Sequence, residues 1–321
     1  MSAHEPNQTP AFVSKDLLRN PRGSSRSESV PGEESANRNR PTQAALAGRR
    51  SVRHHPTGPS VSARLHRGVC VKAAVTSLFR WVVGLVVFAV AGTAVLISAL
   101  IAPARHVNAF IRWGCRAVLW AVGVRVRVET EESLQGGPFL FVGNHVNIFD
   151  PFVYGGYLPR PVRGVELESH FRWFLYGAII RRIGNIPIQQ RPGRHVLRSY
   201  EKAAELIRQG ISVVILPEGH RTTTGRLGPF TRAPFRFARN LGLDIVPVAI
   251  VGAYQIKRKG SWQIRPGTVV LRIGRPIRAR QIKRLGDTAL RDLVRERVAG
   301  LLSEHETQRA ENPHRQVREG E

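Results

Sequence analysis

The segment FLFVGNHVNIFDP, residues 139–151, joins a short apolar run to a polar loop. Residues 139–142 follow a Gly-Gly-Pro turn and predict a buried strand, so the loop from Asn144 onward lies at the carboxyl end of that strand. Ligands of open α/β sheets bind at this edge. The segment therefore favours an α/β fold with a functional loop at residues 144–151.

His145 and Asp150 lie in this loop, with no serine or cysteine between them. An imidazole removes a proton from a hydroxyl most effectively when a carboxylate fixes its other nitrogen and stabilises the imidazolium. The pair therefore predicts a general base that acts directly on a substrate hydroxyl. The spacing alone is a weak signal, because a lone loop histidine is more often a hydrogen-bonded surface residue.

A second strand and loop, ISVVILPEGHRT at residues 211–222, strengthens this interpretation. The β-branched residues predict a strand that stops in a turn, and its loop lies beside the first if the two strands are neighbours. Gly219 permits close backbone approach, and the planar guanidinium of Arg221 suits a phosphate. Glu218 is expected to hold that arginine or to accept a substrate hydroxyl. Taken alone, Pro-Glu-Gly is more often a solvated turn.

These residues resemble the 1-acylglycerol-3-phosphate acyltransferase family of the glycerolipid acyltransferase superfamily. Its four blocks are Asn-His-x4-Asp, a Gly-to-Arg block, Pro-Glu-Gly-x-Arg and a Val-Pro-Val strand. All four occur here in that order, at residues 144–150, 184–191, 217–221 and 245–250. The resemblance implies a mostly parallel sheet with helices around it, catalytic roles for the first block, and phosphate binding by the arginines of the second and third.

The chain departs from the family pattern at several positions. Asn147 stands where a small hydroxyl residue is common, and Arg191 is displaced by one position behind two glutamines. Thr231 and Ala233 depart from the usual Phe-Lys-x-Gly, with Arg232 as a substitute for the lysine. Because head groups are contacted there in the family, an acceptor other than lysophosphatidate is the alternative.

The region before the first block is apolar. Trp81 to Ala104 contains no charged residue over 24 positions, which as a helix extends about 36 Å and is enough to cross a hydrocarbon core. After it, Asn108, Arg112 and Arg116 fall on one stripe of a helix that is otherwise largely apolar. This pattern predicts an interfacial helix, and its alternative is a helix packed at the edge of the catalytic domain.

Patterns along the rest of the chain favour alternating strands and helices, which is typical of an α/β domain. Strands are expected at residues 124–128 and 268–273, and helices at 172–182, 194–208 and 288–302. The expected organisation has four regions. These are a disordered basic region at 1–73, the membrane segment and interfacial helix at 74–123, the acyltransferase domain at 124–304 and a polar tail at 305–321.

The net charge of +26 is spread over every region and attracts anionic lipid, coenzyme A or acidic carrier protein. Nucleic acid is not an expected partner, because no nucleic-acid-binding motif accompanies the charge. Cys70 and Cys115 are too few for a disulfide framework, which favours a reducing cytosol. Histidines and cysteines show no metal-ligand spacing, so no metal and no cofactor is expected.

The sequence predicts a membrane-bound enzyme that moves a fatty acyl group from acyl-CoA or acyl carrier protein to a lysophospholipid hydroxyl. By resemblance, 1-acylglycerol-3-phosphate is the leading acceptor and phosphatidate the product. His145 is the expected base and Asp150 its orienting carboxylate, while Arg191 and Arg221 hold the phosphate. The catalytic domain is expected on the cytoplasmic face. A membrane-anchored lipid-binding or scaffold protein without turnover is the alternative from a different class.

Overall fold

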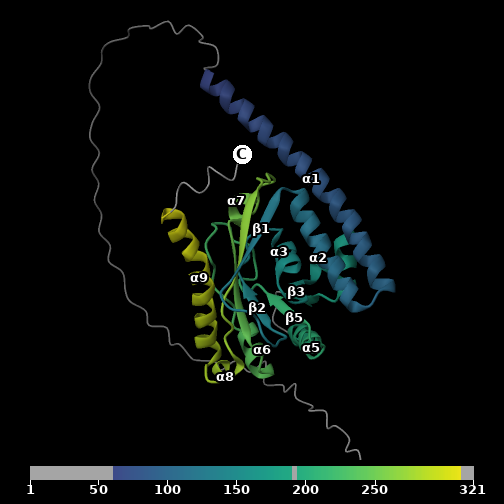
Figure 1. Ribbon diagram of the computed structural model, residues 1–321, viewed down its shortest axis with the longest axis vertical. Helices are drawn as coiled ribbons and strands as arrows, with labels where there is room; N and C mark the ends of the chain where they lie inside the picture. Colours follow the sequence, from purple (N-terminus) through teal and green to yellow (C-terminus); the bar gives the residue numbers. More distant parts are fainter. Residues whose placement is uncertain (1–60, 190–193, 312–321) are drawn as a thin grey trace, which may run out of the picture. The chain divides into compact units, whose positions relative to one another are not determined.

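The computed structural model describes residues 61–189 and 194–311 (Figure 1). In this part of the chain, seven strands form one sheet in the order β1-β7-β6-β2-β5-β3-β4. Their bounds are β1 Val124–Thr130, β2 Leu140–Gly143, β3 Val162–Leu167, β4 Ile186–Ile188, β5 Ser212–Ile215, β6 Ile245–Val251 and β7 Gly267–Ile273. Every pair is parallel except β6–β7. The mostly parallel sheet expected from the sequence is confirmed.

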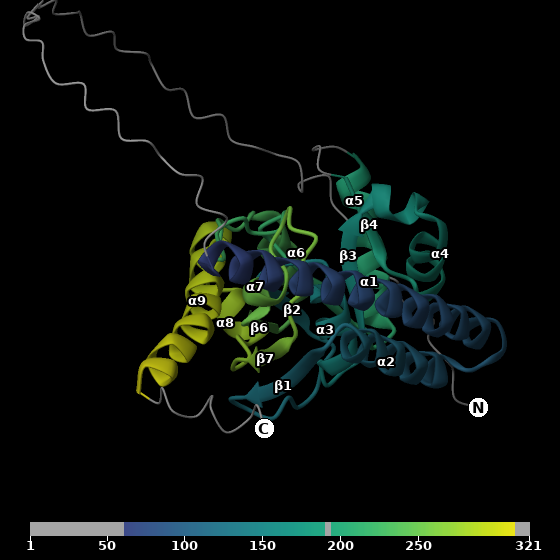
Figure 2. The same cartoon turned by 90° about the horizontal axis from the view of Figure 1, so that it is seen from above.

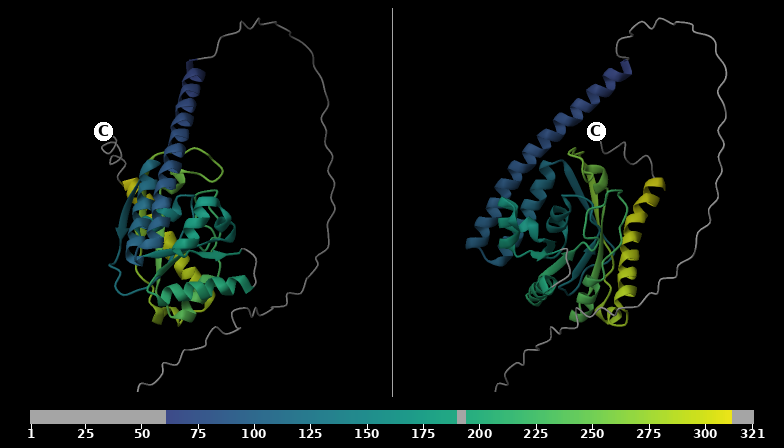
Figure 3. Two further views of the ribbon diagram at one scale, coloured as in Figure 1. Left: turned by 90° about the vertical axis from the view of Figure 1, so that its right-hand side faces the viewer. Right: turned by 180° about the vertical axis from the view of Figure 1, so that it is seen from behind.

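The central strands are buried on both faces, which explains their continuous apolar sequences. Side chains of the 139–142 run alternate between two cores: Phe139 and Phe141 belong to one, and Leu140 and Val142 to the other. The first core is completed by α2 (Ala104–Ala121) and α3 (Asp150–Tyr157). The second is completed by α5 (Arg194–Arg208), α6 (Ala233–Leu241) and α9 (Asp287–Glu311). Figure 3, right, shows α9 and α2 on opposite sides of the sheet.

The remaining short elements connect this framework. They are the 3-10 helix Glu168–Arg172, α4 Phe174–Ile183, α7 Ala253–Ile256 and α8 Ala279–Ile282. The helix expected at 172–182 therefore begins only after residue 173, whereas the one expected at 194–208 has those bounds. The two strands before the polar loops are parallel neighbours, with Leu140 opposite Val213. Both loops consequently leave the same edge of the sheet.

The apolar segment forms α1, Val61–Ile101, of which Val71–Ile101 is long and apolar enough to cross a membrane. The expected helix through Ala104 is interrupted, because α1 ends before Pro103 and α2 begins at Ala104. Proline lacks the backbone N–H that would continue the helix. The expected boundary at residue 73 lies inside α1, and residues 1–60 are outside the described part. The expected polar tail begins inside α9, which continues to Glu311.

One side of α1 packs closely on its neighbours in the compact unit Val69–Glu321. A Cβ on Gly84 would lie 2.6 Å from Val122, and one on Gly92 would lie 2.5 Å from Ile179. Figure 2 shows α1 and α2 side by side. The other side of α1 exposes large apolar residues, namely Val71, Val75, Leu78, Phe79, Val82, Leu85, Val86, Val90, Ile97, Leu100 and Ile101. A contiguous apolar surface of this kind indicates contact with a membrane or another protein.

The polar stripe of α2 faces the sheet domain. Arg116 donates from Nε to the carbonyl of Gly156 at 2.9 Å, and Arg112 donates to the carbonyl of Leu158. These carbonyls lie at the end of α3, where cations satisfy acceptors that the helix leaves open. The outward face of α2 carries Trp113 and Trp120, which are about half and more than three-quarters exposed. The polar stripe therefore packs at the edge of the sheet domain, as the alternative expects.

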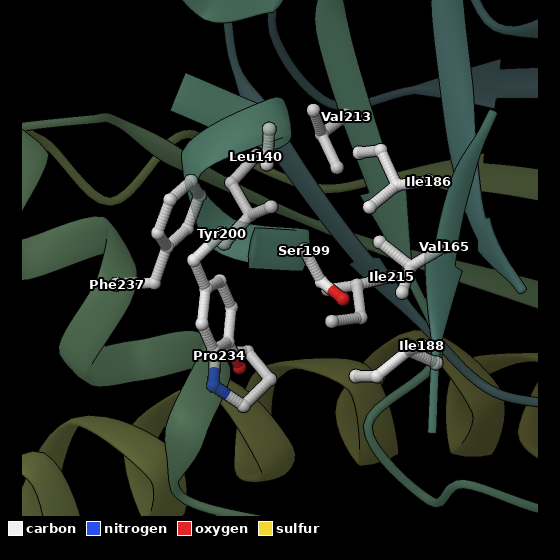
Figure 4. A pocket seen from close by; sticks show the side chains of 11 residues that line it. Leu140, Val165, Ile186, Ile188, Ser199, Tyr200, Val213, Ile215, Pro234 and Phe237 are labelled. Carbon is white, nitrogen blue, oxygen red and sulfur yellow. The ribbon is translucent and has the colours of Figure 1, made fainter. Parts of the chain in front are cut away.

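An apolar cavity of about 10 Å³ lies between the sheet and helices α5 and α6 (Figure 4). It holds about one water-sized sphere. Ser199, one of the lining residues, donates to the carbonyl of Pro187. The lining residues are Leu140, Val165, Ile186, Ile188, Ser199, Tyr200, Ala203, Val213, Ile215, Pro234 and Phe237. The cavity is a small packing void in the second core and does not include the two polar loops.

Candidate active site

His145 and Asp150 meet at the carboxyl edge of β2. The distance from His145 Nδ1 to Asp150 Oδ2 is 2.8 Å, and the side chains are 23% and 0% exposed respectively. The same carboxylate oxygen accepts the backbone N–H groups of Val146, at 2.6 Å, and Asn147, at 3.0 Å. Asp150 is also the first residue of α3, where a helix favours negative charge. This geometry holds the proton on Nδ1 and leaves Nε2 as the basic nitrogen.

Two buried asparagine side chains hold the His145 loop in place. Asn144 donates to the carbonyl of Ile250 at 3.0 Å and accepts the N–H of Ile250 at 2.8 Å. It thereby extends the β2–β6 ladder beyond its last paired residue. Asn147 donates to the carbonyl of Ala253 at 2.7 Å and accepts the N–H of Phe149 at 2.8 Å. Sequence reasoning gave neither asparagine this role, although turn-forming asparagine was the available signal.

Glu218 joins the two loops. Its Oε1 accepts the N–H of His145 and its Oε2 the N–H of Gly228, both at 2.8 Å. Burial raises the pKa of the Glu218 carboxyl, and these hydrogen bonds act in the opposite direction. Arg295 of α9 donates to the carbonyl of Gly228 at 3.0 Å. No ion pair joins Glu218 to Arg221 in the described residues, so the contacts of Glu218 position the backbone.

Gly219 adopts a left-handed conformation, with φ of 72°. A Cβ added there would meet no atom within 4 Å, so the backbone conformation selects glycine at this turn. The predicted close approach of a ligand to Gly219 stays a prediction.

Arg221 lies directly beside the His145 loop, because the N–H of Thr222 donates to the carbonyl of His145 at 2.9 Å. Lys259 Nζ donates to the carbonyl of Arg221 at 3.4 Å. Burial, and after it the charge of Arg221, lower the pKa of Lys257. Within residues 61–189 and 194–311, Arg221 forms no ion pair with an acid.

The predicted site is brought together at five of its six positions. His145, Asp150, Glu218, Gly219 and Arg221 all lie on the two loops that leave the sheet next to each other. Arg191 lies outside the described residues, so its predicted phosphate contact stays a prediction.

Comparisons with known proteins find acyltransferases. A family model described as Acyltransferase matches residues 125–251. The chain is 25% identical over 164 residues to a 1-acyl-sn-glycerol-3-phosphate acyltransferase of Cocos nucifera, covering 51% of this chain and 53% of the relative. It is 28% identical over 190 residues to one of Pseudomonas aeruginosa, covering 57% and 73%. The chain spans about half the length of the first of these relatives and of several others it matches.

A solved structure shares the fold. The crystal structure of the 1-acyl-sn-glycerophosphate (LPA) acyltransferase PlsC from Thermotoga maritima matches with a TM-score of 0.64 and 22% sequence identity. The match covers 74% of this chain and 97% of that one. At this identity the likeness establishes the fold alone.

Proposed function

We propose that this chain, which is similar to acyltransferases over residues 125–251, transfers a fatty acyl group from a thioester to the free hydroxyl of a lysophospholipid. The acceptor is 1-acylglycerol-3-phosphate and the product is phosphatidate. The observation that carries the proposal is the His145–Asp150 contact of 2.8 Å, with a fully buried carboxylate and a partly exposed imidazole. Its position beside the Arg221 loop adds the cation that a phosphorylated acceptor requires.

In the proposed reaction, His145 Nε2 takes the proton of the acceptor hydroxyl as that oxygen attacks the thioester carbonyl. The new ester C–O bond forms and the C–S bond breaks, and the proton then passes from the imidazolium to the departing thiolate. Asp150 orients the ring and stabilises its positive form. Arg221 holds the acceptor phosphate, which converts an encounter between two substrates into a reaction within one complex.

The proposed donor is acyl-CoA or acyl carrier protein, and the proposed location is a membrane surface with the catalytic domain on the cytoplasmic side. The exposed apolar face of α1 supports the membrane assignment. An assay on purified membranes tests the proposal, with labelled donors of both kinds offered to a panel of lysolipids. We expect phosphatidate from lysophosphatidate. If a different lysolipid is acylated preferentially, the proposed acceptor is wrong. If no lysolipid is acylated, the proposed enzymatic activity is wrong and the lipid-binding alternative is favoured.

Replacement of Arg221 by lysine is expected to lower kcat/KM for the acceptor by roughly ten-fold or more while changing the donor KM little. A point charge does not reproduce the two parallel hydrogen bonds of a guanidinium on a phosphate. Steady-state kinetics with each substrate varied in turn measure the difference. Arg284→Lys, at an exposed position between α8 and α9, is the matched control. Equal effects of Arg221→Lys on both substrates contradict the assignment.

Helix α1 is proposed to lie along the membrane surface instead of crossing it once. It contacts the rest of the unit at its middle and near its C-terminal end, since Trp81 donates to the carbonyl of Trp262 and Arg182 donates to that of Ala99. Because one domain holds the helix at both of these points, the proposed arrangement keeps the two ends of the chain on the side of that domain.

Protease added to sealed, right-side-out vesicles is therefore expected to leave the N-terminal region of the chain uncut. Immunoblots against tags at the two termini measure this protection, and vesicles opened with detergent are the control for cleavable sites. Cleavage of the N-terminal tag with protection of the catalytic domain establishes a single crossing and contradicts the arrangement.

A further inference from the structure

Trp81 of α1 lies where that helix meets the candidate site. Its ring centroid is 6.4 Å from that of Phe149, the residue directly before Asp150. Its Nε1 donates to the carbonyl of Trp262 at 2.6 Å, and Lys257 Nζ lies 5.9 Å from its ring centroid. One indole therefore contacts both the His145–Asp150 loop and residues 257–264, which we call the 257–264 loop.

The 257–264 loop is itself fixed at its two ends. Lys257 is 8% exposed and donates to the carbonyls of Arg258 and Ser261 inside the loop. At the other end, the N–H of Ile264 donates to Ser77 Oγ at 3.2 Å. Ser77 stands one helical turn before Trp81, so adjacent turns of α1 hydrogen-bond the end of the loop, at residues 262 and 264. At its beginning, the Lys257 ammonium lies near the Trp81 ring.

The same loop supports the segment that carries Arg221. Lys259 Nζ reaches the carbonyl of Arg221 at 3.4 Å. Arg258 lies 5.3 Å from the ring centroid of Tyr254, whose hydroxyl donates to the carbonyl of Thr223 at 2.7 Å. Contacts thus run from α1 through the 257–264 loop to the proposed phosphate-binding arginine, and directly from α1 to the residue beside the catalytic aspartate.

We infer that Trp81 is a positioning residue for acyl transfer, through which the apolar helix sets the geometry of both halves of the site. This inference rests on the proposed function, because it concerns the rate of the same reaction. Trp81 acts through Phe149, which directly precedes α3 and fixes where Asp150 meets His145, and through the 257–264 loop, which supports Arg221. A displacement of about 1 Å in such a constellation costs roughly 100-fold in rate.

The test compares Trp81→Ala with Trp120→Ala, which removes the same side chain from an outward position that is 79% exposed. We expect Trp81→Ala to lower kcat roughly 10- to 100-fold, with donor KM within about two-fold of wild type, while both variants float with vesicles as wild type does. Trp81→Phe is expected to recover much of the loss, because it keeps a ring against Phe149 and loses the Nε1 hydrogen bond. A purely structural role would lower the amount of folded protein without this split between kcat and donor KM.

Hydrogen exchange supplies a measurement that does not depend on turnover. In Trp81→Ala, amides of residues 146–150 and of the 257–264 loop are expected to exchange faster, and in Trp120→Ala they are expected to match wild type. Folded, membrane-bound Trp81→Ala with kcat and exchange equal to those of Trp120→Ala overturns the inference. If the wild-type chain transfers no acyl group, the proposed function fails, and the exchange data alone decide whether Trp81 orders the two loops.

Discussion

Alanine in place of His145 is expected to abolish acyl transfer while the chain stays folded and membrane-associated. Loss of a general base typically removes about 10²- to 10⁴-fold of rate. The imidazole belongs to neither hydrophobic core, so the chain is expected to fold without it. Transfer of a labelled acyl group measures the rate, and thermal unfolding of the same sample measures stability.

Asp150→Asn should be severely impaired as well, because the imidazole loses its anionic partner. His170→Ala is the matched control: His170 Nδ1 also lies near a carboxylate, 3.5 Å from Glu166, with a side chain that is 30% exposed. It takes no part in the proposed reaction and is expected to leave transfer unchanged. Turnover of His145→Ala within a few-fold of wild type would disprove the mechanism.

Removal of the Asn144 side chain is expected to cause the largest loss of stability among changes in the loop. The residue is 5% exposed, and its amide pairs both backbone groups of Ile250. Asn144→Ala leaves a buried N–H and a buried C=O without these partners, at about 1–3 kcal/mol each. The free energy of unfolding, measured by denaturant titration in detergent, should fall by about 2–6 kcal/mol. Acyl transfer should fall with it, since the His145 loop loses its attachment to β6.

Asn185→Ala is the control for stability loss as such. Asn185 is also buried and its amide joins the N–H of Gly164 to Glu166, in the β3–β4 part of the sheet. We expect a comparable loss of stability with activity retained per folded molecule. If Asn144→Ala unfolds with wild-type stability, the proposed role of the amide in extending the ladder is wrong.

The elements that could be predicted from the sequence are those whose pattern is local. The apolar runs before Asn144 and Pro217 correspond to β2 and β5, and the polar residues after them lie at one edge of the sheet. His145, Asp150 and Arg221 became candidates through the two loops taken together and the resemblance to an acyltransferase family, and their catalytic and binding roles stay predictions.

Local sequence patterns predicted neither the direction of the strands nor the presence of the charged strand β3. Apolar residues alternate along 268–273, and this pattern is the same for a parallel and for an antiparallel strand. The antiparallel pairing of β7 with β6 therefore depends on the connection between them. β3 contains Arg163 and Glu166, and was not predicted as a strand. Their partners are remote in sequence: Arg163 donates to Asn108, and Glu166 accepts from Tyr176.

The supporting residues of the site were missed for the same reason. Asn147 appeared as a departure from the family pattern, yet its amide reaches Ala253, more than one hundred positions away. Trp81 appeared as the start of an apolar run, and its contacts with Phe149 and Trp262 arise only in the folded chain. Chemistry-bearing residues follow from residue type and spacing, whereas the residues that orient them follow from tertiary packing.

Hydrogen bonds connect Arg295 to Gly228, Gly228 to Glu218, and Glu218 to His145. This chain of contacts determines when the His145 loop is completed during synthesis of the protein. A ribosome delivers the chain from its N-terminus, so α1 leaves the exit tunnel more than 190 residues before Arg295. The proposed anchor is therefore complete while the carbonyl of Gly228 still lacks its partner from α9. If α1 is the proposed anchor, nascent chains reach the membrane surface first, and the His145 loop gains this support only when α9 docks.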